Sequence, residues 1–237
     1  RSADVVVAVS EPLRKYVADL RGTDRGTIVV RNGCDPQAFP TPAPLRAGGP
    51  QRLVFLGHPK PWHGADELPQ LVTDLRRRGW DVELLVIGGG PGADPVVRKA
   101  QTLGVEDHLE LTGPLSADRA ASRLLEGAVA VAPFPPEPFF YFCPLKVIEC
   151  MAAGLPVVTT AQGDLPDVVA DAGVLVQPGD HQALVAAVEA LLRNQPLRRG
   201  LGARGRERAF SRFTWDRAAD AVIRAATEIV GTRRRVA

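Results

Sequence analysis

The sequence predicts an α/β fold with a Rossmann-like, doubly wound parallel sheet. Short, continuously apolar runs of valine, leucine and isoleucine recur from residue 52 onward, and segments with a helical pattern separate them. Continuous apolar runs indicate strands buried on both faces, as in a parallel sheet covered by helices. Strands and helices that alternate along the chain are typical of this architecture.

The expected strands and helices follow one another in order. The strands are expected at RLVFLG (52–57), DVELLVIGGG (81–90), HLELTG (108–113), AVAVAPF (128–134), GLPVVTT (154–160) and AGVLVQPGD (172–180). The intervening helices are expected at 64–79, 94–104, 116–127, 144–154, 164–171 and 180–194. Two further helical patterns, at 196–210 and 214–230, follow the last strand.

The first part of the chain is organised differently. Residues 3–10 and 26–30 have the composition of strands, and the segment 11–20 between them predicts a helix with Pro12 near its start. Residues 31–50 are rich in proline and glycine and have no apolar period. This composition predicts a linker.

Charge and cysteine content exclude several classes of function. A formal net charge of +2 argues against a dedicated nucleic-acid-binding protein. Arg233, Arg234 and Arg235 form a basic tail that is expected to be solvated, with peripheral contact to a membrane as the alternative. The three cysteines have no C-x-x-C spacing and indicate neither a disulfide framework nor a zinc site. Because the chain begins at Arg1 and its only methionine is Met151, we expect a piece of a longer protein.

The most informative stretch is FFYFCPLKVIECMAAGLPVV, residues 139–158, in which Lys146 and Glu149 lie near the start of an expected helix. Ligands of open α/β sheets bind outside the carboxyl ends of the strands. The turns after the strands are therefore the expected site, and they are GHPKPWHG (57–64), GGGPGAD (88–94), TGPLS (112–116), PFPPEPFFYFCP (133–144) and TTAQGD (159–164).

Taken in order, these segments resemble the C-terminal half of a retaining GT-B glycosyltransferase of the family 4 type. The resemblance covers nearly the whole chain, and it includes the linker pattern formed by Asn32, Gly33, Asp35 and Phe39. It implies that residues 1–39 end an N-terminal acceptor domain and that residues 40–51 are the linker. Residues 52–213 would bind the nucleotide-sugar donor, and residues 214–237 would form a helix that crosses back, with the basic tail.

The resemblance also implies roles for the helix near Lys146. Glu149 matches the residue that accepts hydrogen bonds from the donor's ribose hydroxyls, which suits a carboxylate. The diphosphate is expected at the helix start after Pro144, where the amides of Leu145 and Lys146 are free and the helix dipole favours anions. The Lys146 side chain would add a positive charge there. The alternatives are a solvated lysine and a Glu149 that merely pairs with Lys146 across one turn.

Gly57, His58, Gly113 and Leu115 are the other expected donor contacts. In the family, the turn TGPLS meets the nucleobase, so Gly113 and Leu115 would contact the base through backbone and apolar atoms. The alternative is an ordinary strand-to-helix turn that Ser116 caps.

The sequence departs from the family pattern at two places. Tyr141 stands where the family has a glutamate that touches the donor sugar, and Glu137 is the alternative acid. His58 and His63 stand where the family has an arginine and a lysine that neutralise the leaving diphosphate. A bound diphosphate would raise the pKa of both histidines, so that they and Lys60 stabilise the leaving group; the alternative is that Lys60 serves alone.

We therefore expect a retaining glycosyltransferase with Lys60, His63 and Glu149 as catalytic residues. Its nucleotide-sugar donor is a co-substrate, and no metal or other cofactor is expected. The acceptor, of unknown kind, would be held by an N-terminal domain that this chain lacks, so the chain alone is expected to be inactive. Alternatives are a non-catalytic nucleotide-sugar-binding module of the same fold and a hydrolysing epimerase. The expected location is the cytoplasm, with the inner face of a membrane as the alternative.

Overall fold

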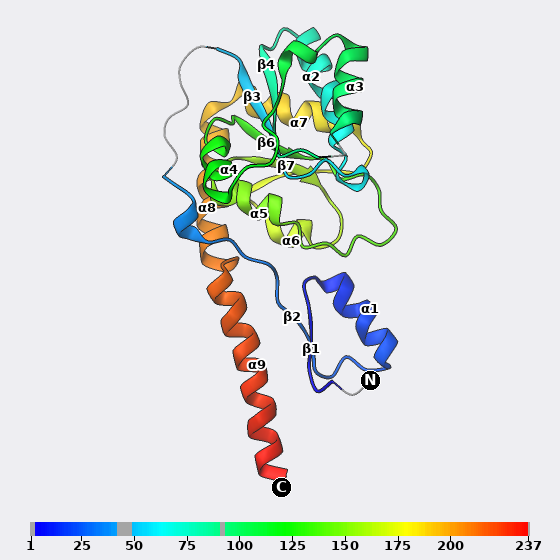
Figure 1. Ribbon diagram of the computed structural model, residues 1–237, viewed down its shortest axis with the longest axis vertical. Coiled ribbons are helices and arrows are strands. Elements are labelled where there is room, and N and C mark those ends of the chain that lie inside the picture. Colours follow the sequence, from blue (N-terminus) through cyan, green and yellow to red (C-terminus); the bar gives the residue numbers. More distant parts are fainter. Residues whose placement is uncertain (1–2, 42–48, 91–92, 237) are drawn as a thin grey trace.

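The computed structural model describes residues 3–41, 49–90 and 93–236, without the side chains of residues 229–236, and shows two parallel sheets (Figure 1). The smaller sheet contains β1 (Val6–Ala8) and β2 (Thr27–Val29), which α1 (Glu11–Arg21) connects. We call β1, α1 and β2 the N-terminal unit. Its helix begins after Ser10, whose side chain accepts a hydrogen bond from the amide of Leu13, as expected for an N-cap.

The larger sheet has the strand order β5-β4-β3-β6-β7-β8, and every neighbouring pair is parallel. Leu53 of β3 lies opposite Leu84 of β4 on one side and Val129 of β6 on the other. The strands span Gln51–Leu56 (β3), Val82–Ile87 (β4), Leu109–Leu111 (β5), Val129–Ala132 (β6), Val157–Thr160 (β7) and Gly173–Val176 (β8). The prediction of a doubly wound parallel sheet is confirmed. Its strand order reverses direction between β3 and β6, the place where such sheets bind ligands.

Two hydrophobic cores cover the two faces of this sheet. Leu53 and Phe55 of β3 belong to one core, and Val54 between them belongs to the other, as the alternation of a strand requires. The helices of the first core are α2 (Leu68–Arg77), α3 (Asp94–Leu103) and α7 (His181–Arg193). Those of the second are α4 (Ala117–Leu124), α5 (Leu145–Ala152), α6 (Leu165–Val169) and α8 (Gln195–Arg212). We call β3 to α8 the sheet domain.

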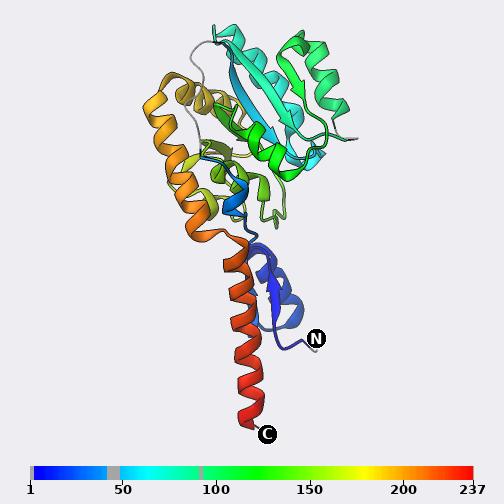
Figure 2. The same cartoon turned by 60° about the vertical axis from the view of Figure 1, so that its left-hand side comes forward.

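The linker passes over the junction between α8 and α9 (Trp215–Val236), and Cys34 makes the contact. The amide of Cys34 donates to the carbonyl of Phe213 at 2.8 Å, and the amide of Trp215 donates to the carbonyl of Cys34 at 3.2 Å. A Cβ on Gly33 would lie 2.3 Å from the carbonyl carbon of Thr214, so this close crossing requires glycine. Beyond it, α9 runs past the N-terminal unit and away from the sheet domain (Figure 2).

Some expectations concern parts of the chain outside this description. They are linker residues 42–48, Pro91 and Gly92 of the glycine-rich turn, and the side chains of the tail arginines 233–235. Of the helices that the structure describes, none combines the length and the hydrophobicity that a membrane span requires.

Candidate functional site

Three loops meet where β3, β4 and β5 end. The amide of Gly88 donates to Oγ1 of Thr112 at 3.1 Å, and Nδ1 of His58 contacts the carbonyl oxygen of Gly89. Gly88 has φ +130°, and a Cβ there would lie 2.5 Å from the carbonyl oxygen of Gly57. Only glycine fits at this position, so the glycine-rich turn brings the β3 and β4 loops into backbone contact.

Lys146 reaches from α5 into this loop cluster, and its amine is buried. The Nζ atom lies 4.4 Å from the ring centre of Phe55 and 5.5 Å from that of Phe134. It has no hydrogen-bond partner in the part of the chain that the structure describes. Burial lowers the pKa of Lys146 to about 7. The alternative of a solvated helix lysine is therefore wrong, because this amine is desolvated and unpaired beside Gly57.

His63 lies in the same cluster and is half-buried. Its Nδ1 is 2.6 Å from the carbonyl oxygen of His58, and its ring packs edge-on to Phe134 at 6.0 Å between centres. Burial and then the charge of Lys146 lower the pKa of His63, although the bond to His58 acts in the opposite direction. His63 is therefore neutral near pH 7 without a ligand, and its positive charge stays a prediction that depends on a bound diphosphate. Lys60 lies half-buried in the same loop.

The amino-terminal end of α5 is open. Its N-cap is Pro144, which provides no side-chain cap. Within the described chain, the amides of Leu145 and Lys146 meet no acceptor. Free amides at a helix start favour an anion, as the sequence predicted for this place.

Glu149 follows on the same helix and is partly buried. Its carboxylate has neither a hydrogen-bond nor an ion-pair partner among the described residues, so the alternative of a pair with Lys146 is wrong. Burial raises the pKa of Glu149. Burial raises the pKa of the thiols of Cys34 and Cys150, and the charge of Glu149 adds a smaller contribution in the same direction. An unpaired carboxylate here is available to accept ligand hydroxyls.

The remaining predicted contacts lie around this cluster. Gly113 has φ +68° and forms an isolated β-bridge with Gly88, so it belongs to the cluster of the three loops. Leu115 packs against the core that contains α4 and α5. Tyr141 lies on the rim, 41% exposed, with its ring stacked on Phe139 at 5.4 Å. The turn that contains Gly113 and Leu115 has no cap from the Ser116 side chain.

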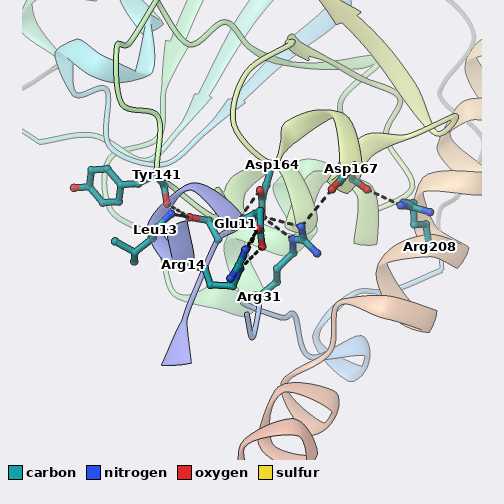
Figure 3. A network of polar contacts seen from close by, with 9 residues as sticks. Glu11, Leu13, Arg14, Arg31, Tyr141, Asp164, Asp167 and Arg208 are labelled. Carbon is teal, nitrogen blue, oxygen red and sulfur yellow. Dashed lines mark hydrogen bonds and ion pairs between the residues drawn. The ribbon is translucent and has the colours of Figure 1, made fainter. Parts of the chain in front are cut away.

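A network that the sequence did not predict joins the N-terminal unit to the sheet domain (Figure 3). Asp164, which is 3% exposed, accepts hydrogen bonds from the Glu11 amide at 3.1 and 3.2 Å and from Nε of Arg31 at 2.9 Å. Ser10 Oγ donates to the carbonyl of Tyr141 at 2.5 Å. The start of α1 is thus held against the loop that contains Tyr141. The N-cap pattern at Ser10 was a signal in the sequence, but nothing near Asp164 indicated a partner more than a hundred residues away.

Replacing Asp164 by alanine is expected to loosen α1. The change leaves the Glu11 amide and the Arg31 guanidinium without their buried acceptor, and such a loss costs about 1–3 kcal/mol. The amides of α1 should therefore exchange with solvent about tenfold faster, while those of β3 to β8 keep their protection. Asp167→Ala is the matched control, because the Asp167 side chain is 77% exposed and lies 3.5 Å from Arg31. Equal exchange in the two variants would contradict this role of Asp164.

The doubly wound sheet and its loop cluster have the fold that is found in one half of GT-B glycosyltransferases. The family model described as "Glycosyl transferases group 1" matches residues 50–194, and the chain belongs to this family.

Named relatives agree with this assignment. One relative is a GDP-mannose-dependent alpha-(1-6)-phosphatidylinositol monomannoside mannosyltransferase of Mycolicibacterium smegmatis. The two sequences are 28% identical over 226 residues, and this alignment covers 90% of this chain and 59% of the relative. It is 32% identical over 242 residues to a D-inositol 3-phosphate glycosyltransferase of Xylanimonas cellulosilytica, covering 94% of this chain and 56% of the relative. The chain thus spans somewhat more than half the length of these relatives.

Solved structures share the fold. A sucrose-phosphate synthase from Thermosynechococcus elongatus superposes with a TM-score of 0.81 at 26% identity, covering 98% of this chain and 59% of that protein. An Anabaena protein solved with UDP and glucose superposes with a TM-score of 0.73 at 20% identity, covering 98% of this chain and 63% of that protein.

Proposed function

We propose that this chain is the donor-binding half of a glycosyltransferase that moves a sugar from a nucleoside-diphosphate donor to an acceptor with retention of configuration. The observation that carries the proposal is the buried, unpaired amine of Lys146 beside the open start of α5. A desolvated cation and free amides together form a place for a diphosphate. Family membership supports the reaction class. The acceptor would bind to a domain of which the N-terminal unit is the end.

In this proposal the chain stabilises the departing diphosphate. The bond between the sugar's anomeric carbon and the diphosphate breaks, and its electron pair moves to the phosphate oxygen. The oxygen of an acceptor hydroxyl bonds to the same face of the sugar, and the hydroxyl proton passes to the departing phosphate oxygen. Lys146 and the amides at the start of α5 hold the developing charge. Lys60 and His63 add to this effect, because the bound diphosphate raises the pKa of His63 and the ring then takes up a proton. Glu149 accepts the ribose hydroxyls. Gly113 and Leu115 lie under the base.

A non-catalytic nucleotide-sugar-binding module is the second candidate. Two observations favour it: Tyr141 stands where the family has an acid, and burial keeps His63 neutral without a ligand. Transfer of labelled sugar by this chain together with its acceptor domain would decide for the enzyme, whereas donor binding without transfer would decide for the module. The 237-residue chain alone is expected to bind the donor and to show no transfer.

Nucleoside diphosphates are expected to bind this chain without a divalent metal. The proposed phosphate ligands are cations and backbone amides, so neutralisation of the diphosphate does not require a metal. Calorimetric titration with UDP, GDP and ADP, each with and without EDTA, measures this directly, and the affinity for the preferred nucleotide should be the same in both conditions. Loss of binding in EDTA would overturn this description of the site.

A further inference from the structure

A pocket lies at the joint between the N-terminal unit and the sheet domain. It is open, has a volume of about 860 Å³, and is formed by the end of β2, helix α6 and the junction of α8 with α9. It shares no residue with the proposed donor site. In Figure 3, Asp167 and Arg208 of this pocket lie on one side of the network and Tyr141 lies on the other.

The lining of this pocket is strongly basic. Four arginines contribute to it, against a single carboxylate, that of Asp167. The arginines are Arg31, Arg208, Arg212 and Arg217. The available carboxylates are taken up by Arg31, which pairs with Asp164 at 2.8 Å and with Asp167 at 3.5 Å. Arg208 has the carboxylates of Asp171 and Asp167 within electrostatic range. Arg212 and Arg217 are therefore the pocket arginines whose guanidinium groups have no carboxylate partner among the described residues.

Arg208 is fixed in place at the wall. Its Nε donates to the carbonyl of Val168 at 2.9 Å, and a terminal nitrogen donates to the carbonyl of Asp167 at 2.6 Å. Burial and then repulsion from Arg212 lower the pKa of Arg208. The carboxylates of Asp171 and Asp167 offset this repulsion only in part, and an anionic ligand beside Arg208 and Arg212 would reduce it further.

Arg212 and Arg217 are available for a ligand. Both side chains are exposed at the pocket, and neither guanidinium has a hydrogen-bond or ion-pair partner among the residues that the structure describes. The hydroxyls of Ser211 and Thr214 lie in the same lining. Arginines with unused planar donors next to hydroxyl groups are the usual partners of phosphate oxygens.

We propose that this pocket binds a phosphate-bearing anion, held by Arg212 and Arg217 with Arg208 as the fixed contact at the wall. The volume exceeds that of an inorganic phosphate ion and suits a phosphate ester. The ester is either a free metabolite or the headgroup of an anionic lipid. Because the pocket touches β2, α6 and α9 together, the ligand holds the N-terminal unit and the sheet domain in one arrangement.

Glycerol 3-phosphate and vesicles of phosphatidylglycerol in phosphatidylcholine are the two probes, used on the 237-residue chain. Calorimetry with glycerol 3-phosphate and vesicle sedimentation should both be compared with Arg212→Gln, Arg217→Gln and the double variant. Each single change is expected to lower affinity about tenfold, because one charged phosphate contact is lost. Arg224→Gln is the matched control, since Arg224 is exposed on α9 outside the pocket and should leave binding unchanged.

The outcomes show whether the ligand is a free phosphate ester or a lipid headgroup, and whether it binds in this pocket. Binding of glycerol 3-phosphate without vesicle binding assigns a free phosphate ester, and vesicle binding that the double variant loses assigns a lipid headgroup. Nucleoside-diphosphate affinity should stay unchanged in Arg212→Gln and Arg217→Gln. Absence of binding to both probes, or an equal loss in Arg224→Gln, would overturn the proposal. Each of these results is independent of whether Lys146 binds the donor.

Discussion

Replacing Lys146 by methionine is expected to stabilise the fold and at the same time to weaken nucleotide binding. A lowering of the lysine pKa from 10.5 to about 7 corresponds to a free-energy cost of folding on the order of 5 kcal/mol when the amine is charged. Methionine has a similar length, carries no charge, and packs well against the rings of Phe55 and Phe134. The residue is thus unfavourable for stability at the place where it is proposed to serve binding.

The gain in stability should depend on pH in a defined direction. Below about pH 7, Lys146 is protonated in the folded and the unfolded chain, and the full cost acts. As the pH rises above 7, the folded chain releases this proton while the unfolded chain keeps it to about pH 10.5, so the wild type becomes relatively more stable. Urea denaturation should therefore show the largest advantage of Lys146→Met near pH 6 and a small one near pH 10. An advantage of equal size at both pH values would contradict burial of a charged amine.

The same variant should lose nucleoside-diphosphate affinity about tenfold to a hundredfold near pH 6, because a charge-assisted contact is removed. In the wild type, the bound diphosphate raises the Lys146 pKa again, so binding takes up a proton and weakens as the pH rises above about 7. Lys146→Met should lose the part of this fall that Lys146 contributes and keep the part that comes from proton uptake by His63. Lys60→Met is the control for stability, since Lys60 is only half-buried and its replacement should leave the free energy of unfolding nearly unchanged.

The sheet was predictable because its determinants are local. A continuous apolar run, such as that of β4, indicates directly that a strand is buried on both faces. All the strands expected from residue 52 onward are present. The glycine-rich turn and the open start of α5 were predictable for the same reason, since glycine and proline restrict the backbone where they stand.

The environment of the site side chains was not predictable in this way. Lys146 and Glu149 are three residues apart on a helix. A lysine and a glutamate with this spacing commonly form an ion pair on the surface. Here the start of α5 faces the ends of β3 and β6, so Phe55 and Phe134 enclose the lysine, and these aromatic residues had the pattern of ordinary core. The contact of Asp164 with Glu11 likewise depends on how two separate sheets are placed, which no local pattern records.

Replacing Glu149 by glutamine is expected to lower donor affinity about tenfold to a hundredfold. The side chain keeps its shape but loses the charge that strengthens acceptance of the ribose hydroxyls, and a hydrogen bond to a charged group contributes roughly 1.5–3 kcal/mol. Because Glu149 has no partner in the described chain, the change breaks no internal contact, and folding should not suffer.

Calorimetry with ribo- and deoxyribonucleoside diphosphates isolates this contact. The unmodified chain should bind the deoxyribonucleotide less well, and Glu149→Gln should shrink that difference because the hydroxyl then has a weaker acceptor. Glu137→Gln is the matched control: Glu137 lies exposed in the loop after β6, and its replacement should change neither the affinity nor the discrimination. If Glu149→Gln leaves both the affinity and the preference for ribose as they are, Glu149 does not hold the donor, and the start of α5 binds the diphosphate without help from this carboxylate.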